Sequence, residues 1–490
     1  MKLWLLIICI LFSLPVIVRG QLRLPKIIAS NMVLQRDKPL LIWGWATPGK
    51  AVGVKFAGQQ KEARANNDGY WAVHINSLSA SSIPAEMVVS SVNSTITLSN
   101  ILVGDVWLAS GQSNMEYMMK NDYAKPAKGI DSLPIELNRK NSQIRLFKVD
   151  KISDSSDVAT RGWNESGGIA LAEFSAPAYY FAKNLQNKLH IPIGIISSAW
   201  NGSRIESWIP VTGDKDISEY ITELADTSQS KGNALLEATG YVAPGEHYNK
   251  MIKPLAPFAI SGFIWYQGET NCMFKEREMG YADKMTALID RWRKAWGNSK
   301  LPFYYVLIAP HKYTMVPTGG AHTAETLPEF WEQQIVALKI PHTEIINVSD
   351  LADTLTDFHS SYKWEVGRRL ALVALIKHYG VKHELYSGPR FSKMKIKGHK
   401  VILTFKFAGG LKTNDGKQPD NFSIAGIDGI FVSATAEIVE NKVIIYATGL
   451  TKPVAVRFAW NEAAQPNLIN NSGIPAFPFR TDGLPWKGKL

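Results

Sequence analysis

Short runs of alternating apolar and polar residues fill the first part of the chain, and turn-forming residues separate them. These runs cover residues 40–46, 51–57, 70–75, 86–92 and 95–101. Alternation with a period of two is typical of strands that bury one face, and no helical periodicity interrupts it here. The pattern predicts a small β-sandwich domain over residues 21–102.

From residue 103 the pattern changes, because strand-like apolar runs now alternate with amphipathic helical segments. We expect strands at 103–109, 191–197, 260–266, 303–309 and 344–348, and helices near 175–189, 279–296, 327–338 and 361–379. Ser175 suits a helix start and Gly380 a helix end. Strands that alternate with helices form a parallel sheet covered on both faces. Residues 103–385 are therefore expected to form an α/β domain.

Strand-like runs return in the last part of the chain. They cover residues 393–397, 400–407, 429–432, 442–447 and 453–460. This predicts a C-terminal β domain over residues 386–490, so that the whole chain has the order β, α/β, β.

The first 20 residues have the composition of a secretory signal peptide. Lys2 precedes an apolar run over residues 3–18, and Arg19 and Gly20 follow it. The alternative is a membrane anchor, but the run is shorter than the roughly 20 residues that a spanning helix needs. We expect cleavage, a secreted or periplasmic protein, and no membrane insertion afterwards. Cleavage removes Cys9 and leaves Cys272 alone, so no internal disulfide is expected.

Positive charge exceeds negative charge, but the excess is spread along the sequence. The formal net charge is +11, and removing Lys2 and Arg19 lowers it by two to +9. No basic block stands out, so we expect no nucleic-acid binding. Attraction to acidic glycans stays open, because net charge alone does not establish it.

Ser113 and His359 are the candidate nucleophile and general base. Ser113 follows the strand at 103–109, and His359 follows the strand at 344–348. Ligands of open α/β sheets bind at the carboxyl ends of the strands, where both residues are expected. A serine hydroxyl needs such a base to act as a nucleophile. Taken singly, each residue is more often structural, for example as a helix cap.

Acyl transfer also needs donors that stabilise a negatively charged oxygen. Gly202 follows the strand at 191–197 and lets a backbone N–H approach a substrate closely. Gln267 and Asn271 follow the strand at 260–266 and carry uncharged amide donors.

Three motifs resemble the sialate O-acetylesterase branch of the SGNH hydrolases. They are Gly-Gln-Ser-Asn-Met at 111–115, Trp-Tyr-Gln-Gly-Glu-Thr-Asn at 265–271 and Asp-Phe-His at 357–359. Further matching segments lie at 203–208, 248–255, 366–370, 456–460 and 467–470. The resemblance implies a serine esterase that removes acetyl groups from sugars, with a three-layer α/β/α domain between two β domains. It implies neither a metal nor a cofactor.

The resemblance also implies roles for individual residues. Ser113 would be the nucleophile and His359 the base, and the N–H groups of Ser113 and Gly202 would form the oxyanion hole with a side-chain amide. Gln267 is the preferred amide and Asn271 its rival. The expected triad acid is Asp357, and the alternatives are Asp350, Asp353 or a Ser/His dyad. Substrate contacts are expected from Gln112, Asn114, Arg204 and Glu269.

The leading hypothesis is therefore secreted deacetylation of sialic acid through an acetyl-enzyme. An esterase of acetylated hemicellulose such as xylan is the alternative within enzymes, and a non-catalytic glycan-binding protein is the alternative outside them. Arg204 bears on this choice, since it could meet a sugar carboxylate or form an ordinary ion pair. Glu269 could likewise anchor a loop. The sequence carries no signal for an oligomeric state.

Overall fold

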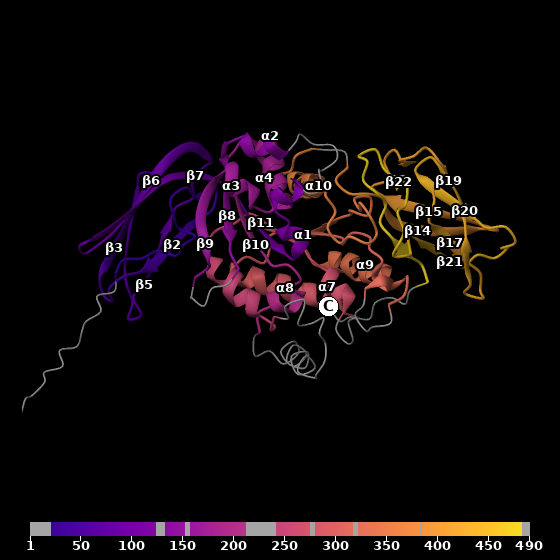
Figure 1. Ribbon diagram of the computed structural model, residues 1–490, viewed down its shortest axis with the longest axis horizontal. Helices are drawn as coiled ribbons and strands as arrows, with labels where there is room; N and C mark the ends of the chain where they lie inside the picture. Colours follow the sequence, from indigo (N-terminus) through magenta and orange to yellow (C-terminus); the bar gives the residue numbers. More distant parts are fainter. Residues whose placement is uncertain are drawn as a thin grey trace, which may run out of the picture.

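The computed structural model describes residues 21–123, 133–151, 157–211, 242–274, 280–316, 322–382 and 385–482. The expected signal peptide at 1–20 lies outside these residues. Figure 1 shows three parts along the long axis: an N-terminal β part, a central part with helices around a sheet, and a C-terminal β part. Within the described residues, no helix is both long and apolar enough to cross a bilayer.

The central sheet has the strand order β13-β12-β11-β7-β10-β8-β9. Its parallel strands are β7 (Ser94–Gly111), β8 (Asn141–Val149), β10 (Ile193–Ala199), β11 (Gly262–Tyr266), β12 (Phe303–Val306) and β13 (Thr343–Ile346). The expected α/β class with parallel strands is confirmed. The edge strand β9 (Thr160–Ser166) runs antiparallel to β8, so the sheet is mixed rather than purely parallel.

Helices cover both faces of this sheet. Figure 1 shows α4 (Ala176–Leu189) and α10 (Lys363–Lys377) on one side, and α8 (Tyr281–Ala295) and α9 (Thr326–Val336) on the other. Because both faces are covered, central strands such as β11 are buried at every residue. Ser175 caps α4, since its hydroxyl accepts a hydrogen bond from the Ala178 N–H at 3.3 Å.

The N-terminal β part is joined to the central sheet through β7. The first half of this strand pairs with β6 (Ser81–Ser91) and β1 (Val33–Gln35), and β3 (Ala51–Phe56) and β4 (Gln59–Arg64) extend that sheet. A second sheet consists of β2 (Leu40–Trp45) and β5 (Tyr70–Ile75). The expected boundary between residues 102 and 103 falls inside β7, so one strand runs through both sheets.

The C-terminal β part has its own apolar core, which includes Leu403, Phe405 and Phe458. Its two larger sheets have the orders β14-β15-β20-β19 and β18-β17-β21-β23, and β16 pairs with β22. The strands are β14 (Arg390–Lys397), β15 (Lys400–Lys406), β16 (Lys412–Thr413), β17 (Phe422–Ala425), β18 (Phe431–Ser433), β19 (Thr435–Val439), β20 (Lys442–Tyr446), β21 (Ala455–Phe458), β22 (Leu468–Ile469) and β23 (Phe479–Arg480).

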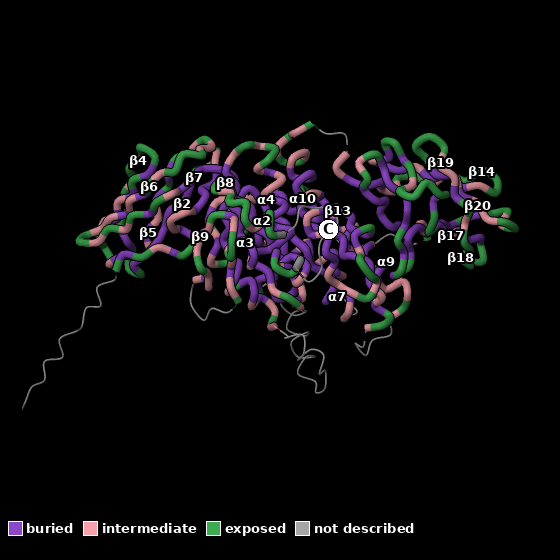
Figure 2. Tube along the Cα trace, turned by 45° about the horizontal axis from the view of Figure 1, so that its top comes forward, coloured by how far each residue is buried: buried purple, intermediate pink, exposed green. Residues whose placement is uncertain are grey.

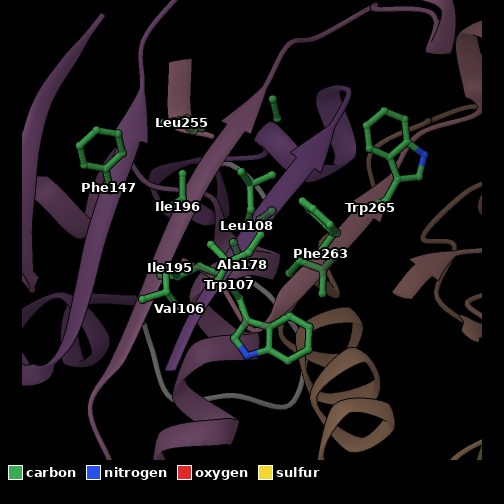
Figure 3. Close-up of a cluster of buried hydrophobic side chains, with 14 of the residues drawn as sticks. Val106, Trp107, Leu108, Phe147, Ala178, Ile195, Ile196, Leu255, Phe263 and Trp265 are labelled. Atoms are coloured by element: carbon green, nitrogen blue, oxygen red, sulfur yellow. The ribbon is translucent and has the colours of Figure 1, made fainter. Parts of the chain in front are cut away.

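Large apolar side chains of the central strands pack together in the core. Figure 3 shows Trp107, Leu108, Ile196 and Phe263 of β7, β10 and β11 packed together, and all four are fully buried. Figure 2 shows the same continuous burial through the central part, with exposed residues confined to the surface. A densely packed core of this kind holds the strand ends, and hence the loops after them, in fixed positions.

Candidate active site

Ser113 lies at the carboxyl end of the central strand β7. It is the first residue of the short helix α1 (Ser113–Glu116), and its side chain is half-buried. Strand β7 lies between β10 and β11, although these two follow each other in the order of the parallel strands. The chain therefore crosses from one side of β7 to the other, which makes this strand end the switch point where open α/β sheets bind their ligands.

Gly111 allows β7 to pass close to the end of β11. Its φ is +140°, and a Cβ at this position would lie 2.1 Å from the carbonyl oxygen of Tyr266. The N–H of Gln112 donates to that same carbonyl at 3.0 Å, and the N–H of Trp200 donates to the Gly111 carbonyl at 3.0 Å. The ends of β7, β10 and β11 are therefore fixed against one another directly before Ser113.

The side chain of Asn114 joins the serine segment to the histidine segment. Its Nδ2 donates to the carbonyl oxygen of Phe358 at 2.9 Å and to Glu269 Oε1 at 2.5 Å. Lys363 Nζ donates to its Oδ1 at 2.7 Å. Asn114, Glu269 and Lys363 are all buried. Asn114 follows Ser113, and Phe358 precedes His359. The buried Asn114 side chain therefore fixes the backbone next to His359 relative to the segment that carries Ser113.

Of the three candidate acids, Asp357 lies against His359. The distance between His359 Nδ1 and Asp357 Oδ1 is 3.7 Å, and the His359 N–H donates to the same oxygen at 2.8 Å. Asp350 instead forms two hydrogen bonds with Arg369, at 2.7 and 2.6 Å. Asp353 accepts from the N–H and the hydroxyl of Ser361, at 2.8 and 3.0 Å. Asp350 and Asp353 are therefore engaged away from the imidazole.

The loop after β10 carries Gly202, whose φ is +69°. This loop is tied to α1, because Glu116 Oε2 accepts from the N–H of Asn201 at 2.6 Å. Lys151 Nζ lies 2.8 Å from the other Glu116 oxygen. The N–H groups of Ser113 and Gly202 donate to no other described residue, so both remain available to a ligand.

Gln267 and Asn271 use their amide groups within the protein. Gln267 Nε2 donates to Gln112 Oε1 at 3.1 Å, to the Ser203 carbonyl at 3.2 Å and to Asn271 Oδ1 at 2.7 Å. An amide nitrogen has only two hydrogens, so these three acceptors occupy both. Asn271 Nδ2 donates to Glu206 Oε2 at 3.0 Å. Both side chains are fully buried.

Gln112 and Glu269 are buried as well, and they tie the loops together. Gln112 Oε1 also accepts from the N–H groups of Gly268 and Thr270, at 3.2 and 3.3 Å, where α7 (Glu269–Met273) begins. Burial raises the pKa of Glu269, although the hydrogen bond from Asn114 and the charge of Lys363 act in the opposite direction. For Gln112, Asn114 and Glu269, these contacts favour a positioning role over direct contact with substrate.

Arg204 and Lys284 form a cluster of two cations around the carboxylate of Glu206. Arg204 Nη2 lies 3.1 Å from Glu206 Oε1, and the buried Lys284 Nζ lies 2.9 Å from the same oxygen. Although burial opposes ionisation, Arg204 and Lys284 lower the pKa of Glu206 to about 2. The Arg204 side chain is 20% exposed. Two cations share one carboxylate here, so the cluster carries an excess positive charge.

Several contacts in this site were not predicted from the sequence. Lys363, Glu116 and Phe358 were not singled out, although Glu116 lies three residues after Ser113 and Lys363 four residues after His359. A charged residue three or four positions after a candidate catalytic residue is a signal from which these contacts could have been predicted. Among the described residues, no group of three or more His, Cys, Asp or Glu side chains is placed to hold a metal ion.

Comparisons with known proteins agree with this geometry. Residues 103–375 match the family model of the sialic acid-specific acetylesterases, a group of carbohydrate esterases. The chain is 25% identical to mouse sialate O-acetylesterase over 93% of its length and 94% of the relative. The human enzyme is 26% identical, with 93% and 92% covered.

A solved structure adds a relative of the same architecture. A carbohydrate acetylesterase from Xanthomonas citri superposes with a TM-score of 0.82 at 33% identity, covering 94% of this chain and all of that one. The sequence motifs, the fold and the family match thus agree. The chain belongs to the sialic acid-specific acetylesterase family of carbohydrate esterases and is a carboxylic ester hydrolase.

Proposed function

We propose that the protein removes O-acetyl groups from sugars through an acetyl-enzyme on Ser113. In the first half-reaction, the Ser113 hydroxyl attacks the acetyl carbonyl carbon while His359 takes its proton. The bond to the sugar oxygen then breaks, and that oxygen receives the proton from His359. In the second half-reaction, His359 activates water, which attacks the acetyl-enzyme. Acetate leaves, and Ser113 regains its proton.

The backbone N–H groups of Ser113 and Gly202 form the oxyanion hole in this proposal. Both donate to no other described residue, and both lie at the carboxyl ends of adjacent strands. Such donors stabilise the charge that develops in the tetrahedral intermediate. Asp357 is the proposed triad acid, because it lies against the imidazole and its two rivals are engaged elsewhere.

Gln267 and Asn271 support the oxyanion hole indirectly. Gln267 would have to release a protein acceptor before it could donate to a substrate oxygen, and Asn271 Nδ2 is directed to Glu206. Gln267 instead links Gln112, which precedes the nucleophile, to Ser203, which follows Gly202. It therefore fixes the separation between the two backbone donors.

One observation carries the proposed mechanism: Asn114 bridges the segment of Ser113 and the segment of His359. The test is acetate release from an activated aryl acetate, together with labelling by a serine-directed phosphonate. Ser113→Ala is expected to abolish both. Ser110→Ala, which removes a buried hydroxyl of β7 three residues earlier, serves as the matched control. Full activity of Ser113→Ala would exclude the mechanism.

The proposed substrate is O-acetylated sialic acid. The family and the curated relatives, which match over more than nine-tenths of the chain, support this choice. Arg204 supports it as well, because the excess positive charge of its cluster can attract the carboxylate of an acidic sugar.

A pair of substrates that differ only in charge tests this specificity. Arg204→Met is expected to raise KM for 9-O-acetylated sialic acid and to leave KM for its methyl ester unchanged. Acetate release from acetylated xylan is measured beside them. Faster release from xylan than from the sialic acid would point to a hemicellulose esterase.

Secretion is part of the same proposal, and the basis for it is the composition of residues 1–20. Expression of the full chain with its first 20 residues should yield an extracytoplasmic protein whose N-terminus begins near Gln21. A mature protein that retains Met1 would contradict this.

A further inference from the structure

The outward face of the sheet β14-β15-β20-β19 gathers lysines from three strands. Alternate residues of β15 and β20, such as Val401, Leu403 and Val443, are buried in the C-terminal core. The residues between them point to the opposite face. The lysines of this outward face are Lys393, Lys395, Lys397, Lys400, Lys406 and Lys442. Figure 2 shows these strands at the end of the molecule, with exposed segments along them.

This lysine face has few acidic partners. On the outward positions of its four strands the acidic residue is Glu437, which accepts a hydrogen bond from the Tyr446 hydroxyl at 3.0 Å. Glu440, in the turn after β19, lies 3.9 Å from Lys442. Among the described residues, the other five lysines form no ion pair. The face therefore carries a clear excess of positive charge.

The strand register places some of these charges against each other. Lys397 lies directly opposite Lys400, and Lys393, Thr404 and Lys442 form a row across three strands. Like charges on opposed positions of a sheet are unfavourable. Lysines on an edge strand can protect it from pairing with another chain, and this accounts for those of β14. It does not account for Lys400, Lys406 and Lys442, which lie on the inner strands β15 and β20.

We infer that the lysine face binds an anionic polysaccharide, in which carboxylates recur along a chain of sugars. The face is an open sheet surface, and its ammonium groups are dispersed over three strands as separate point charges. Tyr446 lies among them, with Lys400 Nζ 4.9 Å from its ring centre, so an aromatic ring is present for contact with a sugar.

A polysaccharide fits this surface better than a nucleic acid does. Arginine is the residue that binds phosphate with two parallel hydrogen bonds. The arginine on the outward positions of the four strands is Arg390, which lies opposite Lys406. Arg390 of β14 is engaged with Glu344 instead. The C-terminal part is also fixed to the catalytic part, through the pairs Arg457–Glu325 and Arg480–Glu332 at 2.7 Å each. A polymer bound to the lysine face would therefore be held on the same molecule as the esterase site, which raises the local concentration of its acetyl groups there.

The test uses the full-length protein and two forms of one polymer. Polygalacturonate is the anionic probe, and fully methyl-esterified polygalacturonate is the uncharged control. We expect binding of the first, weakening as salt is raised, and no measurable binding of the second. The triple variant Lys393→Gln, Lys395→Gln, Lys397→Gln should raise Kd for polygalacturonate at least about tenfold at low salt.

A matched control variant distinguishes the effect of the lysine face on binding from the effect of net charge. Lys50, Lys55 and Lys188 are exposed lysines far from this sheet in the sequence, and changing all three to Gln removes the same charge. This control should change Kd less than about twofold. Both triple variants should keep the parent's unfolding midpoint and its activity on an aryl acetate. Lys400→Gln with Lys442→Gln provides a second variant of the face should the first fold poorly.

Two outcomes would overturn the inference. One is an unchanged Kd in both variants of the face. The other is binding of duplex DNA or of anionic lipid vesicles as tight as binding of polygalacturonate, since that would indicate an unselective basic surface. Because the assay measures polymer binding rather than deacetylation, its result is independent of the proposed substrate.

Discussion

Asn114 and Phe358 are joined by a hydrogen bond of 2.9 Å from the buried amide of the first to the backbone carbonyl of the second. These residues are 244 positions apart, and each is the immediate neighbour of a proposed catalytic residue. Lys363 fixes the amide from its oxygen side. The buried side chain of Asn114 therefore helps to fix the relative position of the segments that carry Ser113 and His359.

Asn114→Ala is expected to lower kcat on an aryl acetate about a hundredfold and to change KM by less than about threefold. The substitution releases the loop of His359, and displacing a catalytic group by about 1 Å is enough for a loss of this size. A purely structural role would lower the amount of folded enzyme instead, and active-site titration with a phosphonate measures that amount.

The matched control for this prediction is Asn187→Ala on the exposed side of α4, which should leave kcat unchanged. Lys363→Met should resemble Asn114→Ala, because it removes the donor that orients the amide. A fully folded Asn114→Ala enzyme with the parent's kcat would show that the bridge does not position the histidine.

Asp357→Asn is expected to lower kcat at least about a hundredfold, since the aspartate of a triad holds the imidazole in the required tautomer. Asp353→Asn is the control. It weakens the acceptor of the Ser361 N–H and hydroxyl, so it should cost about 1 kcal/mol in the free energy of unfolding and little in kcat. Both values come from steady-state kinetics and urea unfolding. Near-parental kcat in Asp357→Asn would indicate a Ser/His dyad.

Much of the central fold follows from local sequence pattern, and the exceptions have physical causes. The central strands and helices were predicted within a few residues because their apolar runs are continuous. Strand β8 was missed because the buried Arg145 interrupts its apolar run, and its guanidinium lies 3.4 Å from Glu165. Strand β4 was missed because it is almost entirely polar.

The candidate site divides in the same way. Ser113, Gly202 and His359 could be proposed from sequence because each follows a strand, and strand ends meet at one edge of a parallel sheet. The contacts of Gln267 could not be proposed, since they depend on which loops face each other in three dimensions. The lysine face could not be predicted from the sequence either, because its residues lie on separate strands and alternate there with core residues.

Gly111→Ala is expected to destabilise the protein by about 3 kcal/mol or more. The new Cβ would lie 2.1 Å from the Tyr266 carbonyl oxygen, and the φ of +140° is unfavourable for any residue with a side chain. Gly49→Ala is the control, since φ is +72° there and nothing lies within 4 Å. It should cost only about 1 kcal/mol. Equal urea midpoints for the two variants would contradict the proposed close contact of β7 and β11.

His247 should make the protein less stable in mild acid. Its ring lies between Trp200 and Trp208, with centroid distances of 4.8 and 4.7 Å. Its Nδ1 lies 2.7 Å from the Ser207 hydroxyl, which donates to the Arg204 carbonyl at 2.8 Å, so Nδ1–H is the donor to Ser207. Burial lowers the pKa of His247 to about 4. The charge of Glu246 acts to raise this pKa, and the charges of Lys250 and Lys151 act to lower it.

Because the folded pKa of His247 lies below the value of about 6.5 for an unfolded chain, the unfolded state binds more protons between these values. The free energy of unfolding should therefore be highest above pH 6.5 and fall by roughly 3 kcal/mol as the pH approaches 4. His247→Gln should remove this contribution, and urea unfolding across the pH range measures it. His399→Gln, at an exposed turn, should leave the pH dependence unchanged. If His247→Gln retains the full slope, the neutral buried imidazole is not its source.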